Sequence, residues 1–450
     1  MKTTYLLLLV GSLLSLASCK KFLDEKPDRS LVVPENVKDL QALLDNTNIF
    51  NADYPYALDI GADDYFLKTA DWLARSASEK NGYIWEKDVF NDNPNNPWSI
   101  SYVIVYNSNV VLDQLKKLGT SAGTQEGINN IKGQALFFRS FAFYNLLQVF
   151  AKPYSVDSAA LQWGIALRLD ADLNKPTTRA TVKQSYDQLI ADTKEASTLL
   201  PDFPALKTRP SKQAAFALLA RTYLSMSDYE NALLYADSAL KLYNTLLDYN
   251  TLNPAATRPV PQFNAECIFH SVYVTTNTLN ILAKVDSALF SSYDANDLRR
   301  SVFFKNNGDG TYSFKGSYDG SARSFNGFAI DEMYLTRAEC FARAGNTSAA
   351  MNDLNALLVK RWKTGTFIPF TASDANQALA EILTERRKEL LMRGIRWSDL
   401  RRLNKEPQFS KTLVRFEDNQ IYYLYPNDPR YVFPIPLLII QMTGIPQNDR

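Results

Sequence analysis

The sequence predicts a mostly α-helical fold, with about four tetratricopeptide-like helix pairs, long loop-rich insertions and a few short strands. Residues 211–243 form the clearest pair, and they match the repeat in residue type and offset at Phe216, Leu219, Ala220, Tyr223, Tyr229, Ala232 and Ala239. The same template returns at Tyr334, Ala338, Phe341, Gly345, Ala350 and Leu354. Ala220 and Ala338 lie 118 residues apart, so insertions must separate the repeats. A generic helical hairpin is the alternative interpretation of each pair.

The other elements follow from apolar spacing, taken in chain order. A helix is predicted at 34–44 and another at 102–117. The helix pairs are predicted near 131–150/182–200, 211–243, 328–362 and 377–403. In the last pair, Gly394 suits the C-terminal cap of the longer helix. A β-hairpin is predicted for 412–424, where Asp418-Asn419 forms the turn.

The N-terminus predicts export. Lys2 precedes an apolar run that ends at Leu16-Ala17-Ser18-Cys19, too short to span a membrane. This pattern resembles a bacterial lipoprotein signal, with residues 1–18 removed and Cys19 carrying the lipid, such as palmitate. A plain signal peptide with an incidental cysteine is the alternative. Residues 19–30 are then a tether, residues 31–450 form a single domain, and the lipid is the only membrane anchor.

The composition excludes several classes of function. There are 49 basic and 48 acidic residues, which gives no reason to expect a nucleic-acid partner. The single histidine, His270, lies in an apolar run, where a structural role is expected rather than catalysis or zinc binding. No CxxC, P-loop, GxGxxG or HExxH motif occurs, so we predict no cofactor and no metal. Cys267 and Cys340 are expected to be buried thiols, with one disulfide between them as the alternative.

The candidate ligand residues lie in the two loop-rich insertions, near 51–98 and 250–327. Sugar binding needs a flat aromatic face for C–H surface and carboxylate or amide groups for hydroxyls. The candidates that combine these properties are Asp63, Asp64, Tyr65, Trp72 and Tyr273. Ordinary half-buried loop residues are the alternative for each. Trp85 and Trp98 are assigned to packing.

Four separate segments of the chain resemble the SusD/RagB family of outer-membrane lipoproteins. The segments that carry the resemblance are Cys19-Lys20-Lys21-Phe22-Leu23-Asp24 with Pro27, Phe138-Arg139 through Tyr144 and Leu147, Glu385-Arg386-Arg387 through Asp399-Leu400-Arg401, and Phe433-Pro434-Ile435-Pro436. Arg396, Trp397, Asp399 and Arg402 match the family motif, and we expect them to fix a helix junction. The chain departs from the family at 437–440, where Leu-Leu-Ile-Ile replaces a polar, acidic stretch.

The resemblance implies a surface-exposed protein of the outer membrane. Its helical scaffold would pack against a TonB-dependent, SusC-like transporter, and its insertions would hold an oligosaccharide for nutrient uptake. The same architecture binding peptides is the first alternative. An adaptor for protein partners alone is a second. A glycosidase, suggested by the paired Asp63 and Asp64, is a third, but neighbouring residues of an extended segment point to opposite faces. We therefore expect a binding protein and no enzyme.

Overall fold

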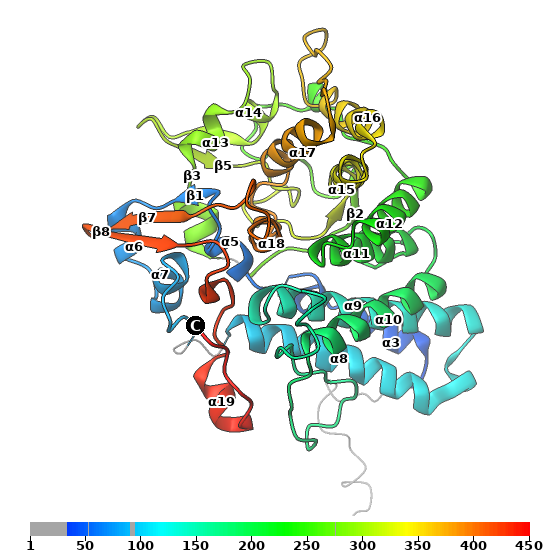
Figure 1. Ribbon diagram of the computed structural model, residues 1–450. Coiled ribbons are helices and arrows are strands. Elements are labelled where there is room, and N and C mark those ends of the chain that lie inside the picture. Colours follow the sequence, from blue (N-terminus) through cyan, green and yellow to red (C-terminus); the bar gives the residue numbers. More distant parts are fainter. Residues whose placement is uncertain (1–33, 53, 91–94, 275) are drawn as a thin grey trace, which may run out of the picture.

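Figure 1 shows a computed structural model of the chain, which describes residues 34–52, 54–90, 95–274 and 276–450. A curved scaffold of helices carries the smaller elements on one side. The helices of this scaffold are α3 (Val37–Leu44), α8 (Pro97–Leu118), α9 (Gln125–Phe150), α10 (Val182–Leu199), α11 (Lys212–Ser225), α12 (Tyr229–Leu242), α15 (Ile330–Arg343), α16 (Thr347–Leu358), α17 (Ala375–Glu389) and α18 (Arg396–Leu403). The predicted helical fold and its four helix pairs are confirmed.

Small and aromatic side chains explain how the scaffold packs. Helices α11 and α12 pack against each other, and both carry fully buried alanines, among them Ala217, Ala220, Ala232 and Ala236, whose short side chains permit close approach of helices. Helix α9 is buried on all sides from Phe137 onward and forms the centre of the core. The phenylalanines of its middle turns contact Phe269 from the second insertion and Phe328, which directly follows that insertion. The insertions therefore share the core of the scaffold.

Side-chain caps set where the scaffold helices begin. Thr124 accepts a hydrogen bond from the backbone of Gly127, which starts α9 six residues before the predicted position. Asn96 caps α8, and Pro97 occupies its first turn, so this helix also begins earlier than predicted. Thr181 and Gln184 form a reciprocal capping box at α10. These local hydrogen bonds fix boundaries that apolar spacing alone places too late.

The end of α17 corrects one sequence prediction. The helix stops at Glu389, and Leu390 takes the cap position, so Gly394 does not cap it. Gly394 instead lies in the turn between α17 and α18, with a φ of +69° that glycine adopts at little cost. The turn is fixed by contacts from the insertions, which the apolar spacing of α17 does not reveal.

The insertions contain short elements that pair across long distances in the sequence. Their helices are α4 (Thr47–Phe50), α5 (Ala57–Ile60), α6 (Thr69–Leu73), α7 (Ala77–Tyr83), η3 (Tyr249–Thr251), η4 (Thr278–Leu282), α13 (Ser287–Ser291) and α14 (Arg299–Val302), and η2 (Gly119–Ala122) follows α8. Their strands are β1 (Tyr65–Phe66), β2 (Cys267–Phe269), β3 (Lys284–Val285), β4 (Phe304–Asn306), β5 (Tyr312–Phe314) and β6 (Phe328–Ala329). The antiparallel pairs are β1–β3, β2–β6 and β4–β5. The pair β1–β3 joins the first insertion to the second.

The C-terminal region follows α18. The predicted hairpin is confirmed as β7 (Leu413–Glu417) and β8 (Gln420–Leu424), and Asp418 and Asn419 both take positive φ in its turn. The turn η5 (Pro429–Tyr431) follows. The apolar departure at 437–440 lies in α19 (Leu437–Thr443), which extends from the body and buries none of its residues. Ile439 and Ile440 are half-buried against the edge of the core, whereas Leu437 and Leu438 are exposed.

Three further expectations concern anchoring and redox state. The signal peptide, Cys19 and the tether lie outside the described residues. Cys267 and Cys340 are both buried and free, as expected for thiols, and they form no disulfide. Among the residues that the structure describes, no helix has the length and apolar character needed to cross a bilayer.

Candidate functional site

The three aromatic residues predicted to contact a ligand are buried in the insertions. Tyr65 is 1% exposed and its hydroxyl donates to the carbonyl of Ile60. Trp72 is 8% exposed and its indole nitrogen donates to the carbonyl of Lys80. Tyr273 is 2% exposed. Ligand contact by these side chains stays a prediction, but their burial favours a packing role.

The two predicted carboxylates lie together in an ion network. Asp63 accepts from Arg396 at 2.6 Å and from Lys411 at 2.7 Å, and Asp64 accepts from Arg387 at 3.2 Å. Burial raises the pKa of Asp63, but Arg396 and Arg387 outweigh burial and hold that pKa well below its usual range. Burial dominates for Asp64, whose pKa is raised despite Arg387. Each carboxylate already has cationic partners, so ligand contact by the pair also stays a prediction.

The late motif has the structural role that the sequence predicted. Trp397 is fully buried against Tyr431 and Phe433, with ring centroids at 4.8 and 5.5 Å. Asp399 accepts from both Arg386 and Arg402 at 2.8 Å. Arg396 reaches back to Asp63 in the first insertion, as described above. The motif therefore joins the last helix pair to the first insertion.

Glu266, Asp331 and Glu389 form a buried cluster of carboxylates. Arginines occupy their oxygens: Arg361 donates to Glu266 and Glu389 at 2.7 Å, and Arg393 donates to Asp331 at 2.6 Å. Burial is the main cause that raises the pKa of Glu266 to about 7, and Arg361 opposes it. Because arginines already supply the positive charge, this cluster serves as a structural ion network.

His270 is also a buried structural residue. Its ring lies between Phe263 and Phe325, at centroid distances of 4.9 and 5.8 Å, and its Nε2 lies 3.0 Å from Asp319 Oδ1. Trp85 and Trp98 are buried as well, which confirms their assignment to packing.

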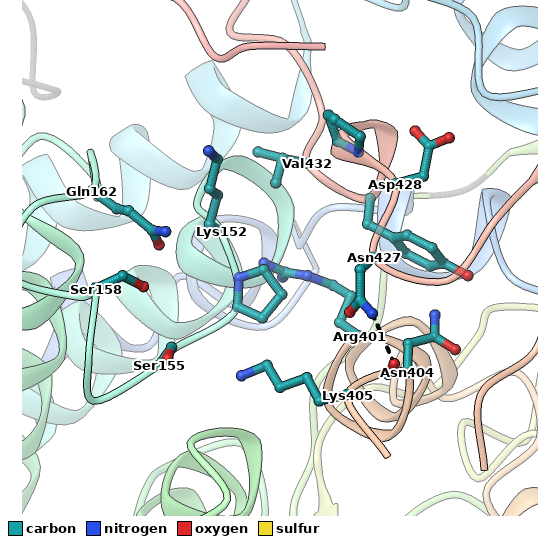
Figure 2. A pocket seen from close by; sticks show the side chains of 13 residues that line it. Lys152, Ser155, Ser158, Gln162, Arg401, Asn404, Lys405, Asn427, Asp428 and Val432 are labelled. Atoms are coloured by element: carbon teal, nitrogen blue, oxygen red, sulfur yellow. Dashed lines mark hydrogen bonds between the residues drawn. The ribbon is translucent and has the colours of Figure 1, made fainter. Parts of the chain in front are cut away.

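A pocket of about 220 Å³ lies between the segment after α9 and the C-terminal region (Figure 2). Ser155, Ser158 and Gln162 line one side, and Asn404 and Asn427 line the other. Asn427 has a φ of +60° and donates to the carbonyl of Asn404 at 2.9 Å, which holds the second wall in place. The remaining residues that line the pocket are Lys152, Pro153, Arg401, Lys405, Asp428, Pro429, Tyr431 and Val432. This wall composition offers hydrogen-bonding groups and cations to a polar ligand.

A second hollow of about 240 Å³ follows one face of α8. Trp98, Tyr102 and Tyr106 line it at successive turns of that helix, but Trp98 is 4% exposed and serves packing, whereas Tyr106 is 39% exposed. Asp170 and Thr177, from the segment between α9 and α10, also line it. Aromatic faces beside carboxylate and hydroxyl groups are the combination that sugar binding requires.

Sequence reasoning missed both hollows. The residues of the Figure 2 pocket come from three segments that are far apart in the chain, near 152–162, 401–405 and 427–432. The one local signal was the spacing of Trp98, Tyr102 and Tyr106, which follow one another at intervals of four residues, although the helix predicted there began only at Tyr102. That spacing is equally typical of a core stripe.

Two family models match the chain, each over a separate stretch. Residues 21–224 match the model described as "Starch-binding associating with outer membrane". Residues 305–438 match the model of the SusD family.

Curated relatives match over shorter stretches. "SusD-like protein P2" of Formosa agariphila is 29% identical over 135 residues, which is 30% of this chain. "SusD-like protein P25" of the same organism is 23% identical over 184 residues, or 36% of this chain. The matches span only 25% and 33% of the lengths of these two relatives.

Solved structures share the fold over nearly the whole chain. A SusD superfamily protein from Bacteroides thetaiotaomicron superposes with a TM-score of 0.75 at 21% identity, covering 92% of this chain and 100% of that one. A laminarin-binding SusD-like protein superposes with a TM-score of 0.67 at 18% identity, covering 91% and 97%. These similarities establish the architecture.

Proposed function

Since this chain belongs to the SusD/RagB family, we propose that it captures an oligosaccharide at the cell surface and delivers it to a partner TonB-dependent outer-membrane transporter. The protein binds its ligand without altering it. Lipid on Cys19 anchors it to the outer membrane. The family matches support this role, and one structural observation carries the choice of ligand.

That observation is the hollow along α8. Tyr106 is exposed on the same face as Tyr102, and Asp170, which pairs with Lys175 at 2.5 Å, lies in the same hollow. An exposed aromatic ring covers the C–H face of a sugar, while a nearby carboxylate accepts from its hydroxyls. Sugar binding thus has an accessible aromatic surface here, whereas Tyr65, Trp72 and Tyr273 are buried.

Calorimetry on the mature chain from residue 20, without its lipid, tests ligand binding. We expect a member of a panel of neutral and anionic oligosaccharides to bind, and Tyr106→Ala to weaken its binding at least tenfold. Tyr425→Ala is the matched control, because Tyr425 is also exposed but lies beyond β8, outside the hollow. Binding of peptides alone would replace this proposal by the peptide alternative, and release of reducing sugar would indicate a glycosidase.

Delivery needs a separate test in cells. We expect the lipidated chain to copurify from the outer membrane with a transporter encoded beside its gene. Cys19→Ala should lose the membrane association. Failure to recover any transporter with the native chain would favour an adaptor for other protein partners.

A further inference from the structure

Arg401 is a buried cation that has no carboxylate partner among the described residues. Its side chain is 3% exposed, and its guanidinium donates to the backbone carbonyls of Gln148 and Ala151 at the end of α9. The neighbouring Arg402 differs, because it pairs with Glu339 at 2.5 Å. Carbonyl dipoles at a helix C-terminus compensate a positive charge only in part. Arg401 therefore adds positive potential to the pocket that it lines (Figure 2).

Two lysines add to this potential at the pocket. Lys152 and Lys405 line it, both are exposed, and neither forms an ion pair within the described part of the chain. Although the residue as a whole is exposed, the Lys405 ammonium is partly buried where it donates to the carbonyl of Tyr154, and this burial, followed by repulsion from Arg401, lowers its pKa. The one carboxylate of the wall, Asp428, is already bound to Arg430 at 2.8 Å. The pocket thus has three cations and no free anion among its lining residues.

The other lining groups match a hydroxyl-rich ligand. Ser155, Ser158 and Asn427 bring hydroxyl and amide groups to the walls. Gln162 Oε1 is a buried atom without a hydrogen-bond partner in the described residues. A volume of about 220 Å³ is below the roughly 300–1,000 Å³ of whole-ligand pockets. The pocket therefore suits one ring or one substituent of a longer molecule.

We propose that this pocket binds an anionic sugar residue, one that carries a carboxylate or a sulfate ester, within the oligosaccharide that the protein captures. Lys152 and Lys405 contact the anionic group directly. Arg401 contributes through its field, because its nitrogens are buried against the end of α9. The proposal rests on the proposed function and narrows its ligand to acidic oligosaccharides. A peptide carboxylate has the same charge, but the serine and amide groups of the walls favour a ligand with several hydroxyls.

The test compares charged sugars with matched neutral ones. Calorimetry on the mature chain would use oligogalacturonate, oligomannuronate and oligoguluronate, each beside its methyl ester, and sulfated beside unsulfated galactan oligosaccharides. We expect at least one anionic sugar to bind tenfold or more tightly than its neutral form, with affinity that falls as salt rises. The uronate and sulfate arms identify which anionic group is bound.

Charge variants locate the effect. The double variant Lys152→Met, Lys405→Met should weaken anionic sugars at least tenfold and leave neutral sugars unchanged. The double variant Lys116→Met, Lys117→Met is the control. Both lysines are exposed on the last turn of α8, so replacing them removes the same amount of charge outside the pocket. Equal affinity for the charged and neutral forms, or equal effects of the two double variants, would overturn the proposal.

The remaining outcomes separate the two proposals. If the chain binds neutral sugars as tightly as their anionic forms, only the proposal of an anionic site is overturned. A chain that binds no sugar at all would overturn the proposed function together with this site. Tighter binding of a peptide with a free C-terminus than of its amide, lost in the pocket variant, would assign the pocket to peptides and also overturn it.

Discussion

The hydroxyl of Tyr273 occupies the space that a side chain on Gly394 would need. A Cβ at Gly394 would lie 1.1 Å from Tyr273 Oη, and Gly394 holds a φ of +69°. Tyr273 belongs to the second insertion, and Gly394 lies in the turn between α17 and α18. The contact therefore locks an insertion to the late motif by close packing, and it explains why glycine stands at this position.

Gly394→Ala should destabilise the fold strongly. Backbone strain at positive φ contributes about 1–3 kcal/mol, and the overlap with Tyr273 adds to it. Gly345→Ala is the matched control, because Gly345 has a φ of +79° and nothing within 4 Å of a new Cβ. Urea unfolding of both variants separates strain from overlap. Equal losses of stability would show that the contact with Tyr273 relaxes freely.

The tyrosines of the insertions can be tested by removing only their hydroxyls. Tyr273 Oη is buried without a hydrogen-bond partner in the described residues, so Tyr273→Phe should keep or raise stability. Tyr65 donates to Ile60, and Tyr65→Phe should lower stability by about 1 kcal/mol. Unfolding curves and glycan affinity are measured on both. A loss of affinity in either variant, without a loss of stability, would restore these tyrosines as ligand contacts.

The scaffold could be predicted from sequence because its signals are local. The alanines of α11 and α12 and the Asp418-Asn419 turn each specify their element within a few residues. The insertions have no local sequence signals of this kind. Tyr65 pairs with Val285, which is 220 residues away. This pairing buries a ring that we expected to contact a ligand, because the sequence around it is irregular. Long-range pairings of this kind decide which aromatic residues are exposed.

The Figure 2 pocket illustrates the same limit for a site. Arg401 lies within the segment that resembled the family motif, and its neighbours Asp399 and Arg402 form an ion pair with each other, consistent with the structural role expected of them. The difference between Arg401 and Arg402 is the partner that each one meets in space. Arg402 reaches Glu339, whereas Arg401 reaches the end of α9. A single sequence does not contain that information.

Asp59 should make stability depend on pH. Burial, followed by repulsion from Asp64, raises the pKa of Asp59 to about 8, although the Gly394 N–H, which donates to it at 2.9 Å, opposes the shift. In the folded protein Asp59 therefore keeps a proton that the unfolded chain releases near its ordinary pKa. The stabilisation is present at low pH and is lost as pH rises toward 8, by up to about 1.4 kcal/mol per pH unit.

Asp59→Asn isolates this effect, since its amide oxygen can still accept from Gly394 and carries no charge. We expect the stability difference between the variant and the parent to grow in favour of the variant from pH 5 to 8. Urea unfolding at several pH values measures that difference. A difference that stays constant with pH would show that Asp59 ionises normally in the folded protein.

Arg361 should be among the most important charges for stability. It is fully buried and donates to Glu266 and Glu389, so Arg361→Met leaves two facing carboxylates without their shared cation. Breaking a buried pair in this way costs about 3–5 kcal/mol. Because loss of the cation raises the folded-state pKa of Glu266 further, the variant should lose less at pH 5.5, where that carboxyl can hold its proton, than at pH 8. Lys363→Met, at an exposed position two residues away, is the control and should change stability little at either pH. Equal losses for Arg361→Met at both pH values would contradict the electrostatic explanation. The cause would then be lost packing against Tyr249, whose ring centroid lies 4.1 Å from the guanidinium carbon.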